Sequence, residues 1–117
     1  MQVVPFAKAP PYDAPKHTGV KAVRLQGGGA SAAGFCMVGL STYEPGGRAE
    51  MDAGAQPKIY VVLSGQIAIT LANGERSMLG PYDSCLIEAY ESREVCNPFT
   101  TDALMLIVTP PMASPDR

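Results

Sequence analysis

The fold is decided by residues 58–74, which read KIYVVLSGQIAITLANG. Two short runs of aliphatic and β-branched residues, 58–63 and 66–71, are separated by Ser64-Gly65 and followed by Asn73-Gly74. Asn-Gly is a strong signal for a tight hairpin turn, because both residues tolerate the positive φ that such a turn requires. The segment therefore predicts short β-strands joined by tight turns.

Similar runs occur on both sides of this segment. Residues 20–25 alternate apolar and polar side chains, and residues 35–42, 84–87 and 104–109 are further short apolar runs. Turn signals, among them Pro45-Gly46-Gly47, separate the runs, and no segment of ten or more residues keeps a helical period between good caps. This rhythm predicts an all-β barrel or sandwich with little helix.

The chain is long enough for one domain. It has 117 residues, 46% of them apolar, which suffices for a single hydrophobic core. Residues 1–19 contain four prolines and should form an extended N-terminal arm, since proline suits an edge strand or a lead-in better than a helix. We expect the barrel over residues 20–111 and a flexible C-terminal tail over residues 112–117.

Composition argues against several classes of partner. The net charge is −2, with 9 basic and 11 acidic residues and no basic cluster, so we expect no nucleic-acid partner. No apolar run approaches the roughly 20 residues that span a bilayer, and the N-terminus does not resemble a secretory signal. The three cysteines are widely spaced, as is typical of reduced thiols. We therefore expect a soluble, cytoplasmic protein with no membrane partner.

Residues 45–66 resemble the first motif of the cupin superfamily. In that motif a Gly, a His-x-His pair, a Glu and a second Gly recur at fixed spacing. Counting from Gly46 to Gly65, the spacing fits. The two His places then fall on Asp52 and Gly54, and the Glu place falls on Lys58.

Residues 82–97 resemble the second cupin motif, in which Gly, Pro, Gly, His and Asn recur. Asn97 alone is unchanged, and the other four places hold Tyr82, Glu88, Tyr90 and Arg93. With the flanking strands the resemblance covers about residues 35–111. It implies an all-β fold, a small conical β-barrel or double-stranded β-helix of the jelly-roll type.

The family's metal ligands have been replaced. In cupins three imidazoles and a carboxylate usually bind a divalent metal, but here their places hold Asp52, Gly54, Lys58 and Arg93. Two of these are cations, which repel a metal ion. The single histidine, His17, lies in the arm outside both motifs. We therefore expect no metal and no other cofactor; a noncanonical metal on Asp52, Cys96 or glutamates is a weaker alternative, because the ligands are too few.

Three residues are candidates for catalysis: Lys58, Tyr60 and Arg93. Lys58 and Tyr60 share one face of a strand, and the motif register puts that face inside the barrel. Arg93 beside Lys58 would suit capture of a carboxylate or stabilisation of an enolate. Each also has a structural interpretation: Lys58 can extend to water at the barrel mouth, Tyr60 can pack in the core, and Arg93 can pair with a glutamate.

Three further residues are candidates for substrate binding. Asp52 lies in the loop before the motif strand and can pair with Lys58, although a solvated loop acid is the ordinary interpretation. Cys96 and Asn97 are adjacent, and Cys96 is the thiol expected to border the cavity. It lacks a nearby base that would make it a nucleophile.

The sequence leaves two functions open. One is a metal-independent isomerase, lyase or dehydratase acting on a small anionic or carbonyl-bearing metabolite. The other is a non-catalytic ligand-binding or accessory barrel, so whether the protein is an enzyme stays undecided at this point. We also expect a homodimer, since the arm looks unable to fold alone and small cupin-like barrels commonly exchange edge strands.

Overall fold

The structure is a computed structural model that describes residues 1–111; the predicted tail, 112–117, lies outside the described residues. The chain forms one short 3₁₀-helix, η1, and nine strands. In order they are η1 (Phe6–Lys8), β1 (Pro11–Tyr12), β2 (His17–Gln26), β3 (Met37–Asp52), β4 (Lys58–Ser64), β5 (Ile67–Leu71), β6 (Arg76–Leu79), β7 (Ser84–Ile87), β8 (Arg93–Cys96) and β9 (Ala103–Thr109).

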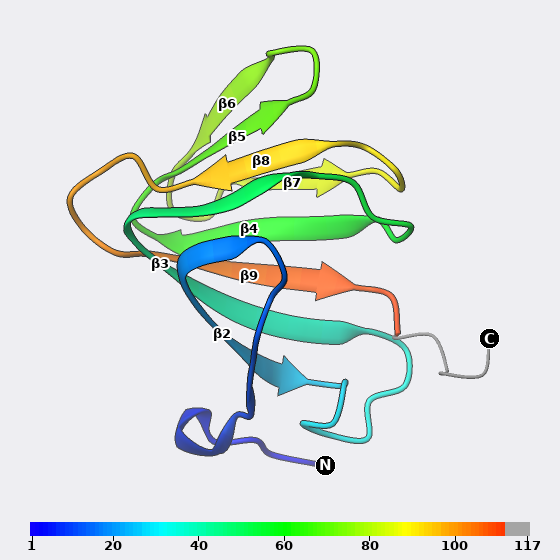
Figure 1. The fold of residues 1–117 in the computed structure, drawn as a ribbon. Coiled ribbons are helices and arrows are strands. Elements are labelled where there is room, and N and C mark those ends of the chain that lie inside the picture. The colour runs from blue at the N-terminus through cyan, green and yellow to red at the C-terminus, as the bar shows by residue number, and fades with distance from the viewer. Residues whose placement is uncertain (112–117) are drawn as a thin grey trace.

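The strands form one antiparallel sheet that curls into a nearly closed barrel. Its main path runs β6-β5-β8-β3-β9-β4-β7, with β2 paired to β3 and β1 paired to β2. The path ends at β6 and at β7, and the β5–β6 hairpin lies at the top of the view with β2 near its bottom (Figure 1). The predicted all-β class and cupin-like barrel are confirmed.

The hairpin between β5 and β6 follows from Asn73-Gly74. Gly74 has φ of +88° and donates its N–H to the Leu71 carbonyl oxygen at 2.9 Å. Asn73 accepts a hydrogen bond from the Glu75 N–H through its side chain, also at 2.9 Å. The turn is therefore stabilised by local contacts, as the sequence predicts.

The prediction of a turn at Pro45-Gly46-Gly47 is wrong, because β3 continues through it as one strand. The first part of β3 pairs with β9, and the part after Gly47 pairs with β8. The glycines let the strand bend rather than end. Gly46 has φ of +79°, and a Cβ on Gly47 would collide with the backbone of Gly19 on β2.

The N-terminal segment belongs to the sheet along part of its length. Residues 1–19 contain η1, β1 and the first residues of β2. Strand β2 pairs with β3 from His17 onward, opposite Ala49. Within the described residues, no helix is long and apolar enough to cross a membrane.

Alternation along the strands points every second side chain into the barrel. The interior is packed with these side chains at one end and hollow at the other. On β4, Tyr60 and Val62 point inward and are 3% and 0% exposed, and Lys58 is on the same face. The core cluster is made of aliphatic and aromatic side chains: Tyr43, Ala49, Tyr60, Val62, Ile67, Ile69, Leu79, Ile87, Val95, Ala103 and Met105. Toward the Lys58 end this packing gives way to a cavity.

Candidate functional site

The cavity inside the barrel is lined mainly by polar and basic side chains. Its volume is about 200 Å³. Its lining is Tyr12, Ala14, His17, Arg24, Met37, Gly39, Ser41, Tyr43, Gln56, Lys58, Tyr60, Arg93, Ile107 and Thr109. Three of these residues are arginine or lysine and none is a carboxylate, so the described walls present net positive charge to whatever occupies the space.

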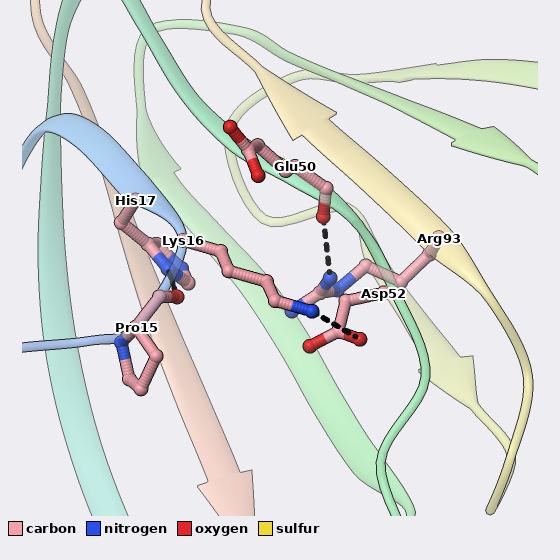
Figure 2. Close-up of polar contacts among 6 residues, drawn as sticks. All are labelled: Pro15, Lys16, His17, Glu50, Asp52 and Arg93. Atoms are coloured by element: carbon pink, nitrogen blue, oxygen red, sulfur yellow. Dashed lines mark hydrogen bonds and ion pairs between the residues drawn. The ribbon is translucent and has the colours of Figure 1, made fainter.

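Arg93 is the buried cation of the site. It begins β8 and is 8% exposed. Its Nε donates to the Tyr60 hydroxyl at 2.8 Å, and its Nη1 donates to the main-chain carbonyl of Glu50 at 3.3 Å. The Glu50 carboxylate points away from the guanidinium (Figure 2). The ion pairs formed within residues 1–111 do not involve Arg93. Its hydrogen bonds go to neutral oxygens, and the nearby Asp52 carboxylate, whose pKa the charge of Arg93 helps to lower, adds a weaker electrostatic contribution.

Burial controls the protonation of the neighbouring groups. It raises the pKa of Tyr60 above its usual value, against the opposing charge and hydrogen bond of Arg93. The Tyr60 hydroxyl therefore stays protonated at neutral pH, so it accepts from Arg93 and keeps its own proton available for donation. Burial, followed by the positive charge of Arg93, lowers the pKa of Lys58, and Asp52 opposes this shift. The two cations thus disfavour each other's charge.

Lys58→Met should therefore raise the melting temperature at pH 7 by about 2–4 °C. Because the folded-state pKa of Lys58 lies below the usual 10.5, its charge opposes folding at every pH below that lowered value. The cost disappears as pH rises from the lowered pKa to 10.5. Melting curves across this range should show the variant's advantage shrinking. Lys21→Met is the matched control, since Lys21 is an exposed lysine paired with Glu44; an equal rise in both variants would contradict the assignment.

The structure brings Lys58, Tyr60 and Arg93 together on one cavity, but the lining does not include Asp52, Cys96 or Asn97. Asp52 is exposed and pairs with Lys16 at 3.3 Å, and this hydrogen bond lowers the pKa of the Asp52 carboxyl. Cys96 is partly buried outside the lining.

Asn97 is fully buried, and its side chain serves the backbone around it. Its Nδ2 donates to the carbonyls of Tyr43 at 2.9 Å and Thr101 at 2.7 Å, and its Oδ1 accepts from the Phe99 N–H at 3.0 Å. These bonds use both amide hydrogens and an oxygen lone pair within the fold. The geometry fits a structural residue rather than a ligand contact.

The cavity also contains residues that sequence reasoning missed. Arg24 could have been found, because the alternation of residues 20–25 puts it on the same face as Ala22, which is buried. Its guanidinium stacks 4.1 Å from the centroid of the Tyr12 ring. Tyr12 and His17 gave no such signal, because the proline-rich segment has no periodicity that predicts where it packs.

The donor set does not fit the metal centre that the two resembled motifs usually form in the cupin superfamily. Of the four motif places, only Asp52 carries a metal-ligating side chain, and it forms its ion pair with Lys16. Lys58 and Arg93 bring positive charge instead. In the described part of the chain, no group of three or more histidine, cysteine, aspartate or glutamate residues could hold a metal ion.

Fold and cavity together define an all-β barrel whose interior cavity is lined by three basic side chains. Comparison with known proteins agrees with this class. The chain is 38% identical over 107 residues to a Mycobacterium tuberculosis protein named β-D-galactosidase Rv1717, covering 92% of this chain and 91% of that protein. No family model matches the sequence.

Solved structures show the same fold at low sequence identity. The polyketide cyclase RemF from Streptomyces resistomycificus superposes with a TM-score of 0.85 at 17% identity, over 98% of this chain and 82% of that one. An RmlC-like cupin from Shewanella frigidimarina gives 0.77 at 16% identity, over 99% and 95%. KdgF from a Halomonas species gives 0.77 at 15%, over 96% of both chains. The chain belongs to one family with the Mycobacterium tuberculosis protein and has the fold of solved cupin structures.

Proposed function

We propose that the barrel binds a small anionic, carbonyl-bearing metabolite in its cavity and acts on it as a metal-independent isomerase, lyase or dehydratase. The observation that carries the proposal is the convergence of Arg24, Lys58 and Arg93 on a cavity without a carboxylate in its lining. Cations held close together in a poorly solvated space repel one another, and an incoming anion relieves that cost. A volume of about 200 Å³ is smaller than the roughly 300–1,000 Å³ of pockets for drug-sized ligands, which limits the occupant to a small metabolite.

Arg93 and Tyr60 suit stabilisation of developing negative charge. Arg93 can offer its remaining N–H groups to a carboxylate or to an enolate oxygen. Tyr60 accepts from Arg93, which leaves its own hydroxyl proton free to donate to a ligand oxygen. Both groups are buried and fixed by their mutual hydrogen bond, so little reorganisation is needed when charge develops.

Glycoside hydrolysis is the second candidate, because the relative with 38% identity is named a β-D-galactosidase. Most glycosidases use a pair of carboxyl groups that flank the scissile bond. The cavity lining contains no Asp or Glu, and Asp52 is paired with Lys16. A basic lining without carboxyl groups favours an acidic ligand over a neutral galactoside. A non-catalytic binding barrel is the third candidate, and the homodimer stays a prediction.

A matched pair of sugars separates these candidates. D-galacturonate carries a carboxylate where D-galactose carries a hydroxymethyl group. We expect galacturonate, or another small carboxylate in a panel of acids and their neutral amides, to raise the melting temperature in a concentration-dependent way. At an acid concentration of about 100 times Kd, the folded state should gain about 2.7 kcal/mol of stability. The neutral partners should have little effect.

Hydrolysis of a nitrophenyl β-D-galactoside should be absent in the same preparation. If galactose stabilises the protein as strongly as galacturonate does and the nitrophenyl galactoside is cleaved, the protein is a glycosidase and the anion proposal is wrong. If acids bind but no chemical change occurs in any of them, the non-catalytic function is correct.

A further inference from the structure

The single histidine of the chain lies at the cavity, although its place in the sequence gave no reason to expect it there. His17 begins β2 and contributes to the lining with Tyr12 and Ala14 from the segment before it. Its ring centroid is 6.5 Å from that of Tyr43, tilted by 55°. His17 therefore lines the same cavity as the basic groups but comes from a different part of the chain.

One hydrogen bond fixes the tautomer of His17. Its Nδ1 lies 2.7 Å from the main-chain carbonyl oxygen of Pro15 (Figure 2). A carbonyl oxygen can only accept, so Nδ1 must carry a proton. In the neutral ring the lone pair is then on Nε2, which has no hydrogen-bond partner within residues 1–111. A histidine fixed in this way by its other nitrogen is the arrangement used for proton transfer.

The backbone around His17 is held by contacts with β3. The residue before it, Lys16, has φ of +60°. The Lys16 carbonyl accepts from the Glu50 N–H at 3.0 Å, and its ammonium group pairs with Asp52 at 3.3 Å. Figure 2 shows Lys16 reaching from the N-terminal segment toward the strand that carries Glu50 and Asp52. These contacts position the imidazole against the cavity.

We infer that His17 is the catalytic base of the proposed reaction, with Nε2 removing a proton from the carbon next to the ligand's carbonyl. This inference rests on the proposed function. The C–H electron pair moves into the C=C bond of an enolate, and the charge on oxygen is stabilised by Arg93 and Tyr60. The imidazolium then returns its proton to the same carbon, or, where that carbon bears a hydroxyl group, to the former carbonyl carbon while the hydroxyl proton passes to the enolate oxygen. The sequence of steps is redox-neutral and needs no co-reactant.

Other groups in the lining suit the base role less well. Tyr60 and Tyr43 are held protonated, because burial raises the pKa of both hydroxyls. Arg24 and Arg93 stay charged, as guanidinium groups do in proteins. Lys58 is the competing base, since burial lowers its pKa. Variants of His17 and Lys58 must therefore be compared directly.

The test uses the acid that stabilises the wild type most strongly in the panel above, incubated in D₂O. We expect wild type to exchange the proton next to the carbonyl for deuterium, as followed by ¹H NMR. His17→Asn should lose exchange by about 10²–10⁴-fold, the usual contribution of a positioned acid–base group. It should keep the thermal response to the acid, because the asparagine N–H can still donate toward Pro15. Arg93→Met should lose both responses.

A second measurement checks the geometry of His17 first without the acid and then with it. ¹⁵N-histidine labelling gives signals from one residue only, since the chain has a single histidine. At high pH we expect Nδ1 to be the protonated nitrogen, and adding the acid should shift the Nε2 signal.

The possible failures are distinguishable. If no acid in the panel raises the melting temperature, the proposed function is wrong and the inference is lost with it. If acids bind but His17→Asn exchanges as fast as wild type, or the neutral ring carries its proton on Nε2, His17 is not the base. Loss of exchange in Lys58→Met with retention in His17→Asn would assign the role to Lys58.

Discussion

Replacing Arg93 with methionine should abolish the stabilisation of the protein by carboxylates and should at the same time raise the melting temperature of the ligand-free protein. The two effects have one cause. Arg93 is 8% exposed, and its hydrogen bonds go to the Tyr60 hydroxyl and the Glu50 carbonyl. Burying an ion costs several kcal/mol, and neutral hydrogen bonds return only part of that.

The expected magnitudes are large enough to measure. Methionine fills much of the same space without charge, so the unliganded variant should melt about 4 °C higher, as for a gain of about 1 kcal/mol. Loss of the charge-assisted hydrogen bonds to the ligand should cost about 1.5–3 kcal/mol, or about 10–150-fold in Kd. Thermal melts and calorimetric titration with galacturonate or the strongest acid of the panel give the two quantities.

Arg48→Met is the matched control. Arg48 is exposed on β3 and pairs with Glu94 at 3.3 Å, outside the cavity lining. It should change neither the melting temperature nor the response to acids by much, because exposed ion pairs contribute little. An Arg93→Met variant that responds to acids as strongly as wild type would show that the ligand binds elsewhere.

Replacing Asn97 with alanine should destabilise the fold by about 3–5 kcal/mol, which corresponds to a melting temperature lower by about 12 °C or more. The substitution leaves the buried carbonyls of Tyr43 and Thr101 and the N–H of Phe99 without their side-chain partner. Each unsatisfied buried group costs about 1–3 kcal/mol, reduced where water can enter. Urea unfolding measures the change.

The anion response separates a structural Asn97 from a ligand-binding one. Measured below its own melting temperature, Asn97→Ala should still gain stability from the same acid. Asn73→Ala is the matched control, since Asn73 makes one side-chain bond, to the Glu75 N–H, in an exposed turn and should lose far less stability. An Asn97→Ala variant that melts like wild type but ignores the acid would make Asn97 a ligand contact.

The sequence by itself predicted most of the strands and the face of β4 that lines the cavity. The runs 58–63, 66–71 and 104–109 differ from β4, β5 and β9 by one residue at their ends. This success has a local cause, because alternation with period two and turn residues act within a few positions. Strands β6 (Arg76–Leu79) and β8 (Arg93–Cys96) were not indicated, since each has only four residues and two of those are polar or charged.

The tertiary structure alone decided which side chains share the cavity. Alternation and motif spacing pointed Lys58, Tyr60 and Arg93 inward, but they also suggested Asp52, Cys96 and Asn97, which lie outside the lining. The positions of Asp52, Cys96 and Asn97 depend on how far each strand extends and where it bends. A shift of one residue in pairing would exchange the two faces of a strand.

His17 shows the same limit most clearly. His17 pairs opposite Ala49, 32 positions further along the chain (49 − 17). No local pattern in a proline-rich segment encodes that contact. The sequence determined a cupin-type barrel with a basic interior, because strand faces and turns are short-range properties. The position of its histidine beside that interior was decided by long-range register, because strand pairing brings distant residues together only when the whole sheet closes.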